Sequence, residues 1–423
     1  MHGILCSKIN NKIFHGKRLN TEYILFSVFL FINYPLLNYL FIQIFPILSP
    51  NVIELLLQVV LYGNMAIIFF NLYLNEGYLR KRKVHIYLLF YFLVVFITFV
   101  IHQSYLIDRS IVLLKAFLNC YLLFLVIYLF GNVDLFIKSM HKGILLNTGL
   151  AIVYYLIIHN NQSIISTQGQ TISYIILLYI CMAIYFTFRR FRLSELLCFL
   201  ADLFLIFQFG SRTILLMIIA YFLIESISLY IKTFINSKTK KRTVLLVVGI
   251  TVLLLLLLVV INIQYLASLV YDHFVSIGIH NRFLRLLANG EFITQSSGRI
   301  DSFYSLILDD IVRNPFGNGL AYDRVVLFND HIKNGAATIV FEGSYSHNFF
   351  LEYFHAFGIF IGFVAIVFFV RNYALTIKNN MDIVLLFSII GFFPLLLTSS
   401  FLVFKNFWIF VAILILLKER STV

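Results

Sequence analysis

The chain has 423 residues, of which 61% are hydrophobic and only 12% are charged, and its mean hydropathy is +0.94. A water-soluble domain carries about 25% charged and 45–50% apolar residues, so this composition excludes a soluble globular protein and indicates a polytopic membrane protein. The net charge of +13 does not indicate nucleic-acid binding, because the basic residues alternate with the apolar stretches instead of forming one patch.

Twelve apolar stretches are long enough, or nearly long enough, to cross a membrane as α-helices, which requires about 20 residues. We therefore predict an all-α polytopic membrane protein. Residues 1–20 lack the apolar core and cleavage site of a removable signal peptide, so the first span is expected to direct insertion. The predicted spans are residues 22–46, 52–74, 84–102, 111–130, 143–158, 172–188, 194–209, 213–231, 244–262, 348–370, 382–399 and 401–417.

Lysine and arginine are distributed unevenly between the two sides of these spans. Most of the 32 lie in the N-terminal tail, in alternate loops such as RKRK at 80–83, and in the C-terminal tail. The positive-inside rule assigns these segments to the cytoplasmic side, so both termini are predicted to be cytoplasmic. The basic residues predicted on the outer side are exceptions to this rule, so each requires an explanation. They are Arg109, Lys115, Arg212, Arg282, Arg285, Arg299, Arg313, Arg324, Lys333 and Lys405.

The longest segment between spans is the outer loop of residues 263–346, which separates spans one to nine (residues 1–262) from spans ten to twelve (residues 347–423). Within it, SGRIDSFYSLILDDIVRNP places apolar residues along one helical stripe, and Pro315 ends that helix. The glycines of GNG at 317–319 then turn the chain. We expect the loop to fold as a small helical cap.

Cysteine spacing indicates neither a disulfide nor a zinc site. Of the four cysteines, one lies in the N-terminal tail and three lie in predicted spans, and no CxxC pair occurs. The adjacent acids Asp309 and Asp310 are interpreted as the solvated face of a helix, so no metal site is predicted.

Three of the outer cations are candidates for binding a phosphate group. Arg212, in FGSRTILL, begins a predicted inward-running helix, whose first amides favour anions. Arg299, in SSGRIDSF, opens the loop helix, and Lys115 lies near the outer end of span four. Guanidinium binds phosphate oxygens bidentately. The alternatives are snorkelling anchors for Arg212 and Lys115, and a surface ion pair with Asp301 or Glu291 for Arg299.

The stretch SYSHNFFLEYFHAFG places His347 and Asn348 at the mouth of span ten. A neutral imidazole takes up a proton near neutral pH, so His347 is the candidate catalytic base. Asn348 is a candidate for orienting His347 or for binding a sugar hydroxyl. Tyr345 and Glu352 are supporting candidates. The alternative for His347 is a capping role at the start of the helix. His355 lies two turns deeper and is a weaker candidate for the base.

Together these stretches resemble the O-antigen polymerase and O-antigen ligase superfamily of bacterial inner-membrane enzymes. The resemblance rests on FGSR, the Gly298–Arg299 pair, NPFGNG at 314–319 and HNFFLE at 347–352, and it covers about residues 210–365. It implies a fold like that of glycosyltransferases of the GT-C class. It also implies a multi-pass protein of the bacterial inner membrane, with the active site facing the periplasm.

The resemblance implies a glycosyltransferase that uses no metal or cofactor. A polymerase transfers a growing glycan from undecaprenyl pyrophosphate to a lipid-linked repeat unit, with a chain-length regulator as a partner, whereas a ligase transfers the glycan to lipid A core. Arg212 and Arg299 would bind the donor pyrophosphate, and His347 would activate the acceptor hydroxyl. A single displacement would invert the anomeric centre. The NPFGNGL and HNFFLEYFHAFG stretches are closer to the polymerase branch.

Two functions of other classes remain as alternatives. A flippase or other transporter of lipid-linked oligosaccharide would also bind these lipids, but transporters typically show related halves and functional charges near the membrane midplane. Here the outer charges crowd the rim and the two halves show no mutual resemblance. A membrane sensor or scaffold would need none of the candidate site residues. All of these functions involve membrane lipids, and none involves nucleic acid.

Overall fold

The computed structural model describes residues 19–101, 103–158, 162–209, 211–236, 262–276, 282–290, 294–333, 341, 344–397 and 399–421. Within these residues the protein is entirely helical and has no strand, which confirms the all-α prediction. Among these described residues, seven helices are long and apolar enough to cross a membrane, or up to eight when one bent helix pair is counted as a span. The predicted span at 244–262 lies outside the described residues, apart from its last residue.

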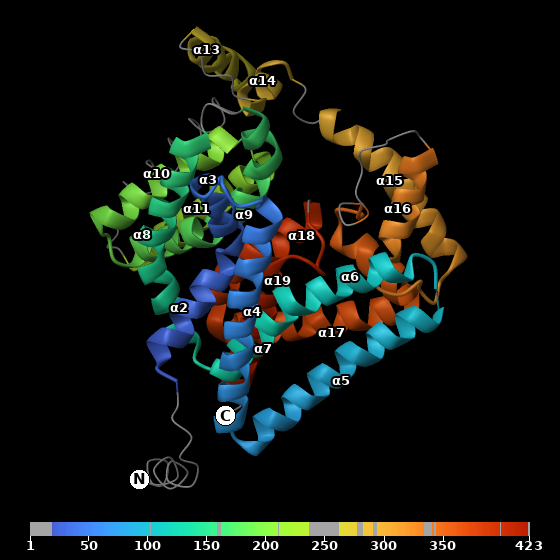
Figure 1. The fold of residues 1–423 in the computed structure, drawn as a ribbon. Helices are drawn as coiled ribbons and strands as arrows, with labels where there is room; N and C mark the ends of the chain where they lie inside the picture. Colours follow the sequence, from blue (N-terminus) through green and yellow to red (C-terminus); the bar gives the residue numbers. More distant parts are fainter. Residues whose placement is uncertain are drawn as a thin grey trace, which may run out of the picture.

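Helices from the two halves of the chain pack against one another (Figure 1). The first half contains α2 (Thr21–Ile32), α3 (Tyr34–Ile44), α4 (Pro50–Asn75), α5 (Tyr78–Ile101), α6 (Leu106–Ala116), the π-helix η1 (Phe117–Tyr121), α7 (Leu122–Phe130), α8 (Val133–Ile158), α9 (Gln162–Arg189), α10 (Leu193–Phe209) and α11 (Arg212–Asn236). The predicted outer loop contains α13 (Ile263–Ser276), α14 (Arg282–Ala288), α15 (Thr294–Arg313) and α16 (Tyr322–Lys333). The chain ends with α17 (Phe349–Phe387), the π-helix η3 (Ser388–Phe392), α18 (Phe393–Leu397) and α19 (Lys405–Ser421).

The first predicted span is broken, because α2 and α3 meet at an angle of 70°. Pro35 has no N–H group and cannot donate to the carbonyl of Phe31, four residues before it. The ammonium group of Lys405 instead donates to the Phe31 carbonyl at 2.7 Å. Asn33, at the break, donates to the hydroxyl of Tyr179 at 2.7 Å. Backbone groups freed inside a membrane need such partners, and the Lys405 side chain from a distant helix supplies one for the Phe31 carbonyl.

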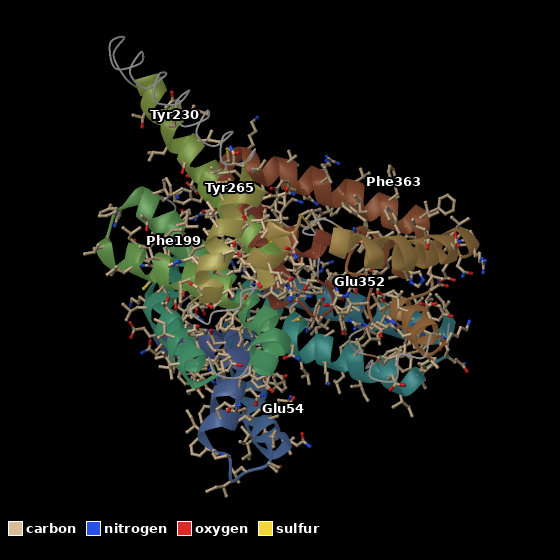
Figure 2. All side chains as sticks on the ribbon, turned by 90° about the horizontal axis from the view of Figure 1, so that it is seen from above. Glu54, Phe199, Tyr230, Tyr265, Glu352 and Phe363 are labelled. Carbon is tan, nitrogen blue, oxygen red and sulfur yellow. The ribbon has the colours of Figure 1, made fainter. Side chains whose placement is uncertain are left out.

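The tenth and eleventh predicted spans share one long helix, α17, which departs from helical geometry at two residues. Gly358 has φ 76° and ψ 168°, and Asn380 has φ −137° and ψ 40°. Asn380 lies between the two predicted spans. The loop expected there is therefore only a local break in the helical geometry of α17. Figure 2 shows Glu352 inside the molecule, whereas Phe363 of the same helix lies on the outer surface and is 61% exposed. The apolar exposed face is suited to lipid contact.

Charged side chains tie together the helix ends that the positive-inside rule assigned to one face. Each pair joins residues from tails or loops predicted on the cytoplasmic side, so these segments lie at the same end of the molecule. The pairs are Glu22–Lys142 (3.8 Å), Lys83–Glu419 (2.5 Å) and Asp134–Arg420 (3.0 Å).

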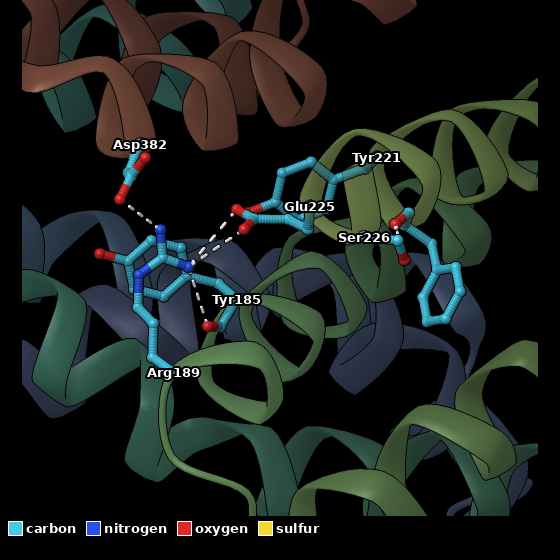
Figure 3. A network of polar contacts seen from close by, with 7 residues as sticks. Tyr185, Arg189, Tyr221, Glu225, Ser226 and Asp382 are labelled. Atoms are coloured by element: carbon cyan, nitrogen blue, oxygen red, sulfur yellow. Dashed lines mark hydrogen bonds and ion pairs between the residues drawn. The ribbon is translucent and has the colours of Figure 1, made fainter. Parts of the chain in front are cut away.

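Arg189 joins three helices at that end, as Figure 3 shows. Its guanidinium lies 3.4 Å from the carboxylate of Glu225 on α11 and 2.8 Å from that of Asp382 on α17. It also stacks on the ring of Tyr185, with 3.5 Å between its central carbon and the ring centroid. Tyr221 donates a hydrogen bond of 2.9 Å to Glu225. A planar cation with several donors is well suited to such a junction.

The predicted loop helix is present as α15, and it ends at Arg313, before Pro315, as expected. It begins earlier than predicted, at Thr294, so Arg299 lies within the helix and does not open it. Its apolar residues Ile307 and Ile311 are buried together with Leu327 of α16, and side chains of α17 pack against them. The helices α15 and α16 therefore form an apolar layer on the first part of α17.

Candidate functional site

The NPFGNG turn lies directly on the break in α17. Ile359 would normally donate its N–H to the carbonyl of His355 within the helix, but Gly358 interrupts the helix at this point. Ile359 instead donates to the turn, and the released carbonyls of α17 accept from the turn. The three backbone bonds, each 2.9 Å, run from Ile359 N to Pro315 O, from Asn318 N to His355 O and from Gly319 N to Ala356 O. The NPFGNG turn is therefore in direct backbone contact with α17, a few residues after the HNFFLE stretch.

His355 is buried beneath this turn and serves as a junction. Its Nε2 lies 2.6 Å from the carboxylate of Asp310 on α15, and the same carboxylate accepts a bond of 2.7 Å from the Asn318 side chain. The imidazole is 1% exposed and stacks on the ring of Tyr322. A side chain enclosed in this way can hold α15, the turn and α17 together, but it is not accessible to a large sugar substrate.

Four charged side chains lie buried next to the turn, and we call Arg109, Asp323, Arg324 and Glu352 the ion cluster. Each is at most 2% exposed. Arg109 and Asp323 interact electrostatically, as do Glu352 and both Asp323 and Arg324. The cluster thus holds two basic and two acidic side chains. Removing one partner of such a buried pair is strongly destabilising.

Polar contacts join the ion cluster to the segment before α19. Glu352 accepts hydrogen bonds from the Ser400 hydroxyl and from the Phe401 amide, the latter at 3.1 Å. Arg324 donates to the same Ser400 hydroxyl at 3.3 Å. Arg109 donates to the Leu320 carbonyl at 3.0 Å. The cluster therefore connects α6, α16, α17 and the chain around residue 400 at one end of the helical bundle.

His347 lies beside this cluster in a backbone conformation that is held from both sides. Its φ is 53°, in the left-handed region that residues other than glycine rarely adopt. On one side, the amide of Ser346 donates to Asp323 at 3.1 Å. On the other side, Asn348 caps α17 by accepting from the amides of Phe350 and Leu351. Strain of this kind persists only where neighbouring contacts impose it, and it is concentrated at functional sites.

Three side chains form a column that ends at the imidazole. The guanidinium of Arg324 lies over the ring of Tyr345 at 5.0 Å, and the centroids of the Tyr345 and His347 rings are 4.1 Å apart. Arg324 is fully buried, whereas Tyr345 and His347 are half-buried. The column thus runs from the fully buried Arg324 to the half-buried imidazole of His347.

The structure brings together four of the sequence-predicted site residues, namely Tyr345, His347, Asn348 and Glu352. The alternative interpretation gave the capping role to His347, but the helix cap is its neighbour Asn348. The amide nitrogen of Asn348 also donates to the Leu396 carbonyl at 3.3 Å. Glu352 is enclosed in the ion cluster and does not face open space.

The three predicted phosphate-binding cations lie elsewhere in the chain. Arg212 is the first residue of α11, as expected, and Arg299 lies within α15. The positions of both side chains fall outside what the structure describes. Lys115 is exposed on α6.

Sequence reasoning did not assign Arg109, Asp323 or Arg324 to the site. The two arginines did carry a signal, because both break the charge-sorting rule on the predicted outer side. Their acidic partners could not be identified from the sequence, since the contacts join segments as far apart as Arg109 and Leu320.

No cofactor or metal site emerges from the described ranges. Among these residues, no group of three or more His, Cys, Asp or Glu side chains is arranged to hold a metal ion. Asp310, one of the two adjacent acids, is bound to His355 and Asn318 instead.

No protein-family model, no curated protein and no solved structure matches this chain.

Proposed function

We propose that the chain is an O-antigen polymerase, a membrane glycosyltransferase that transfers a growing glycan from undecaprenyl pyrophosphate to a lipid-linked repeat unit. The motif resemblance supplies the reaction class. The observation that carries the proposal is the position of His347, a half-buried imidazole with a left-handed backbone that Asp323 and Asn348 hold in place. A general base requires this combination of an accessible ring and a fixed orientation.

In this mechanism, a ring nitrogen of His347 takes the proton from the attacking sugar hydroxyl. The new glycosidic bond forms at the anomeric carbon of the donor as the bond from that carbon to the pyrophosphate oxygen breaks. Attack from the face opposite the leaving group inverts the anomeric centre. Arg212 and Arg299 bind the pyrophosphate and stabilise its charge as it leaves, so no metal ion takes part in the step.

The proposal includes a location and a topology. The chain resides in the bacterial inner membrane with twelve spans, a GT-C-like fold and both termini in the cytoplasm. The site then faces the periplasm, where the ion cluster and the NPFGNG turn lie at the opposite end of the bundle from the Lys83–Glu419 and Asp134–Arg420 pairs. A chain-length regulator is the expected protein partner.

Complementation of a gene deletion tests the proposal. The host strain carries the wild type, His347→Ala or His347→Gln, and its surface polysaccharide is separated on a gel. We expect the two variants to leave single repeat units on lipid A core, as the deletion does. His273→Ala is the matched control, because His273 is exposed on α13, away from the site. A normal ladder with His347→Gln would contradict the assignment of His347.

The same gel separates polymerase from ligase. If the deletion strain accumulates full-length polymer on undecaprenyl pyrophosphate while its lipid A core stays bare, the enzyme is a ligase. The stereochemistry of the product tests the displacement step separately, since retention of configuration excludes a single displacement.

A transporter of lipid-linked oligosaccharide is the second candidate, and two observations favour it. The α2–α3 pair is a broken helix, and Asp202 is a fully buried acid in the middle of α10. Transporters commonly use such broken helices and intramembrane charges. Purified protein in liposomes that moves lipid-linked oligosaccharide without lengthening it would support this candidate against the polymerase.

A further inference from the structure

A second set of ionisable side chains lies between α8 and α10, away from the ion cluster. His141 Nε2 lies 2.5 Å from Glu195 Oε1. Two turns further along both helices, the hydroxyl of Thr148 donates to Asp202 Oδ2 at 3.1 Å. The partners in both pairs are 54 residues apart in the chain. The two helices therefore run parallel in register, and the pairs form two rungs about 10 Å apart along the axis. We call these four residues the α8–α10 ladder.

The first rung borders a cavity of about 110 Å³, which is lined by His141, Arg192, Glu195 and Cys198 together with Ile144, Leu145 and Ser194. That volume is large enough to hold water. The cavity lies where α8 and α10 begin, which is the face predicted to be cytoplasmic.

The second rung is enclosed in the bundle. Asp202 is 0% exposed, and its Oδ1 has no hydrogen-bond partner among the described residues. Cys198 lies between the rungs, hydrogen-bonded to Thr148 and within electrostatic reach of both Glu195 and Asp202. A hydroxyl and a thiol therefore connect the deep carboxyl group to the cavity.

No cation compensates Asp202 from the neighbouring helices that the structure describes. The only charged residue of α9 is Arg189, which binds Glu225 of α11 and Asp382 of α17 (Figure 3). α10 itself contains no Lys or Arg, and Arg192, which directly precedes it, lies 4.0 Å from Glu195 at the mouth of the cavity. The side chains of Arg212 and Lys232, also on α11, are not among those described.

On α8, the remaining charged residues also point elsewhere. Asp134 pairs with Arg420 and Lys142 pairs with Glu22. Lys138 is exposed. An ionised carboxylate without a cation is strongly disfavoured in such surroundings, and acids inside membrane helices commonly mark proton pathways.

We propose that the α8–α10 ladder is a proton-binding site that opens to the face where α8 begins, with His141 and Glu195 at the entrance and Asp202 as the deep acceptor. Cavity water exchanges a proton with the first rung. The Cys198 thiol and the Thr148 hydroxyl carry the exchange to Asp202. In each step one O–H, N–H or S–H bond breaks as another forms. The site is independent of the chemistry at His347.

Carbodiimide labelling of the purified protein in phospholipid vesicles tests the proposal. Dicyclohexylcarbodiimide is apolar and modifies protonated carboxyl groups within membranes, and peptide mass spectrometry locates the product. We expect Asp202 to be modified in mildly acidic buffer and progressively less as the external pH rises. Glu225 is the internal control, because Arg189 and Tyr221 bind it, and it stays unmodified. The proposal is overturned if Asp202 stays unmodified, or if the extent of its modification does not change with the external pH.

Two further measurements test the access route. A small water-soluble methanethiosulfonate should react with Cys198, which lines the cavity, and spare Cys120 and Cys181, which are 0% exposed. In Glu195→Gln, with its fold checked by thermal unfolding, labelling of Asp202 should respond more slowly than in the wild type to a jump in external pH, because a relay sets the rate of proton exchange. An unreactive Cys198, or an unchanged response rate in Glu195→Gln, excludes the cavity as the route.

Discussion

Gly317 and Gly358 pack backbone against backbone, and neither position has room for a side chain. A Cβ atom on Gly358 would lie 2.4 Å from the carbonyl oxygen of Pro315, and one on Gly317 would lie 2.5 Å from the amide nitrogen of Gly358. Both residues also have positive φ angles, which are 90° at Gly317 and 76° at Gly358. This contact fixes the NPFGNG turn on α17, and the turn leads directly into the ion cluster.

Gly358→Ala should therefore destabilise the protein strongly. With φ 76° and ψ 168°, Gly358 adopts a conformation that is essentially restricted to glycine and that costs another residue about 1–3 kcal/mol. Forcing an extra carbon into a packed site costs about 1–3 kcal/mol more. We expect a lower midpoint of thermal unfolding in detergent. Gly63→Ala on α4 is the matched control, since a Cβ there meets nothing within 4 Å, and alanine is the better helix former. Equal midpoints for the two variants would contradict the close contact.

The effects of removing Arg324 and Glu352 from the ion cluster should not add. Arg324→Met leaves Glu352 without a cation, and breaking a buried pair in this way costs about 3–5 kcal/mol. Glu352→Gln in turn leaves Arg324 without the Glu352 carboxylate. The double variant Arg324→Met/Glu352→Gln removes both charges, so we expect it to be more stable than the sum of the single effects predicts. Chemical unfolding of the four proteins measures the coupling, and strict additivity would contradict a direct interaction.

The sequence was sufficient for those features that depend on local pattern. The end of α15 before Pro315 and the start of α11 at Arg212 follow from local rules for prolines and helix ends. The break of the first span was missed, although Pro35 lies inside the predicted range of 22–46 and cannot continue an ordinary helix. The feature was visible in the sequence, but the donor that makes the break possible, Lys405, lies at the other end of the chain.

The candidate site was predictable only in part, for the same reason. The local order SYSHN identified His347 and its helix-capping neighbour. The ion cluster depends on contacts between distant segments, such as Arg324 with Ser400, which no periodicity reveals. Charge sorting indicated that Arg109 and Arg324 needed an explanation. It could not show that they are buried together with acids.

Tyr345 should act through its ring and not through its hydroxyl. The ring contacts both the Arg324 guanidinium and the His347 imidazole, and Tyr345→Phe keeps both ring contacts. Tyr345→Ala removes them and frees the imidazole to adopt other orientations. Under the proposed function, we expect a near-normal polysaccharide ladder with Tyr345→Phe and shorter or absent polymer with Tyr345→Ala. If Tyr345→Phe is as defective as Tyr345→Ala, the hydroxyl has a direct role and the stacking explanation fails.

The broken first span offers a test in which one change compensates for another. Lys405→Met leaves the Phe31 carbonyl without its ammonium donor, and a hydrogen bond to a charged group contributes about 1.5–3 kcal/mol. Pro35→Ala restores an N–H group four residues after Phe31, where a continuous helix supplies the donor. Lys405→Met should therefore cost less in the Pro35→Ala background than in the wild type, with a coupling of about 0.5–3 kcal/mol. Unfolding free energies of the two single variants and the double variant measure this difference. Additive effects would show that Lys405 stabilises the break through its contacts with the Phe31 and Tyr34 rings and not through the carbonyl.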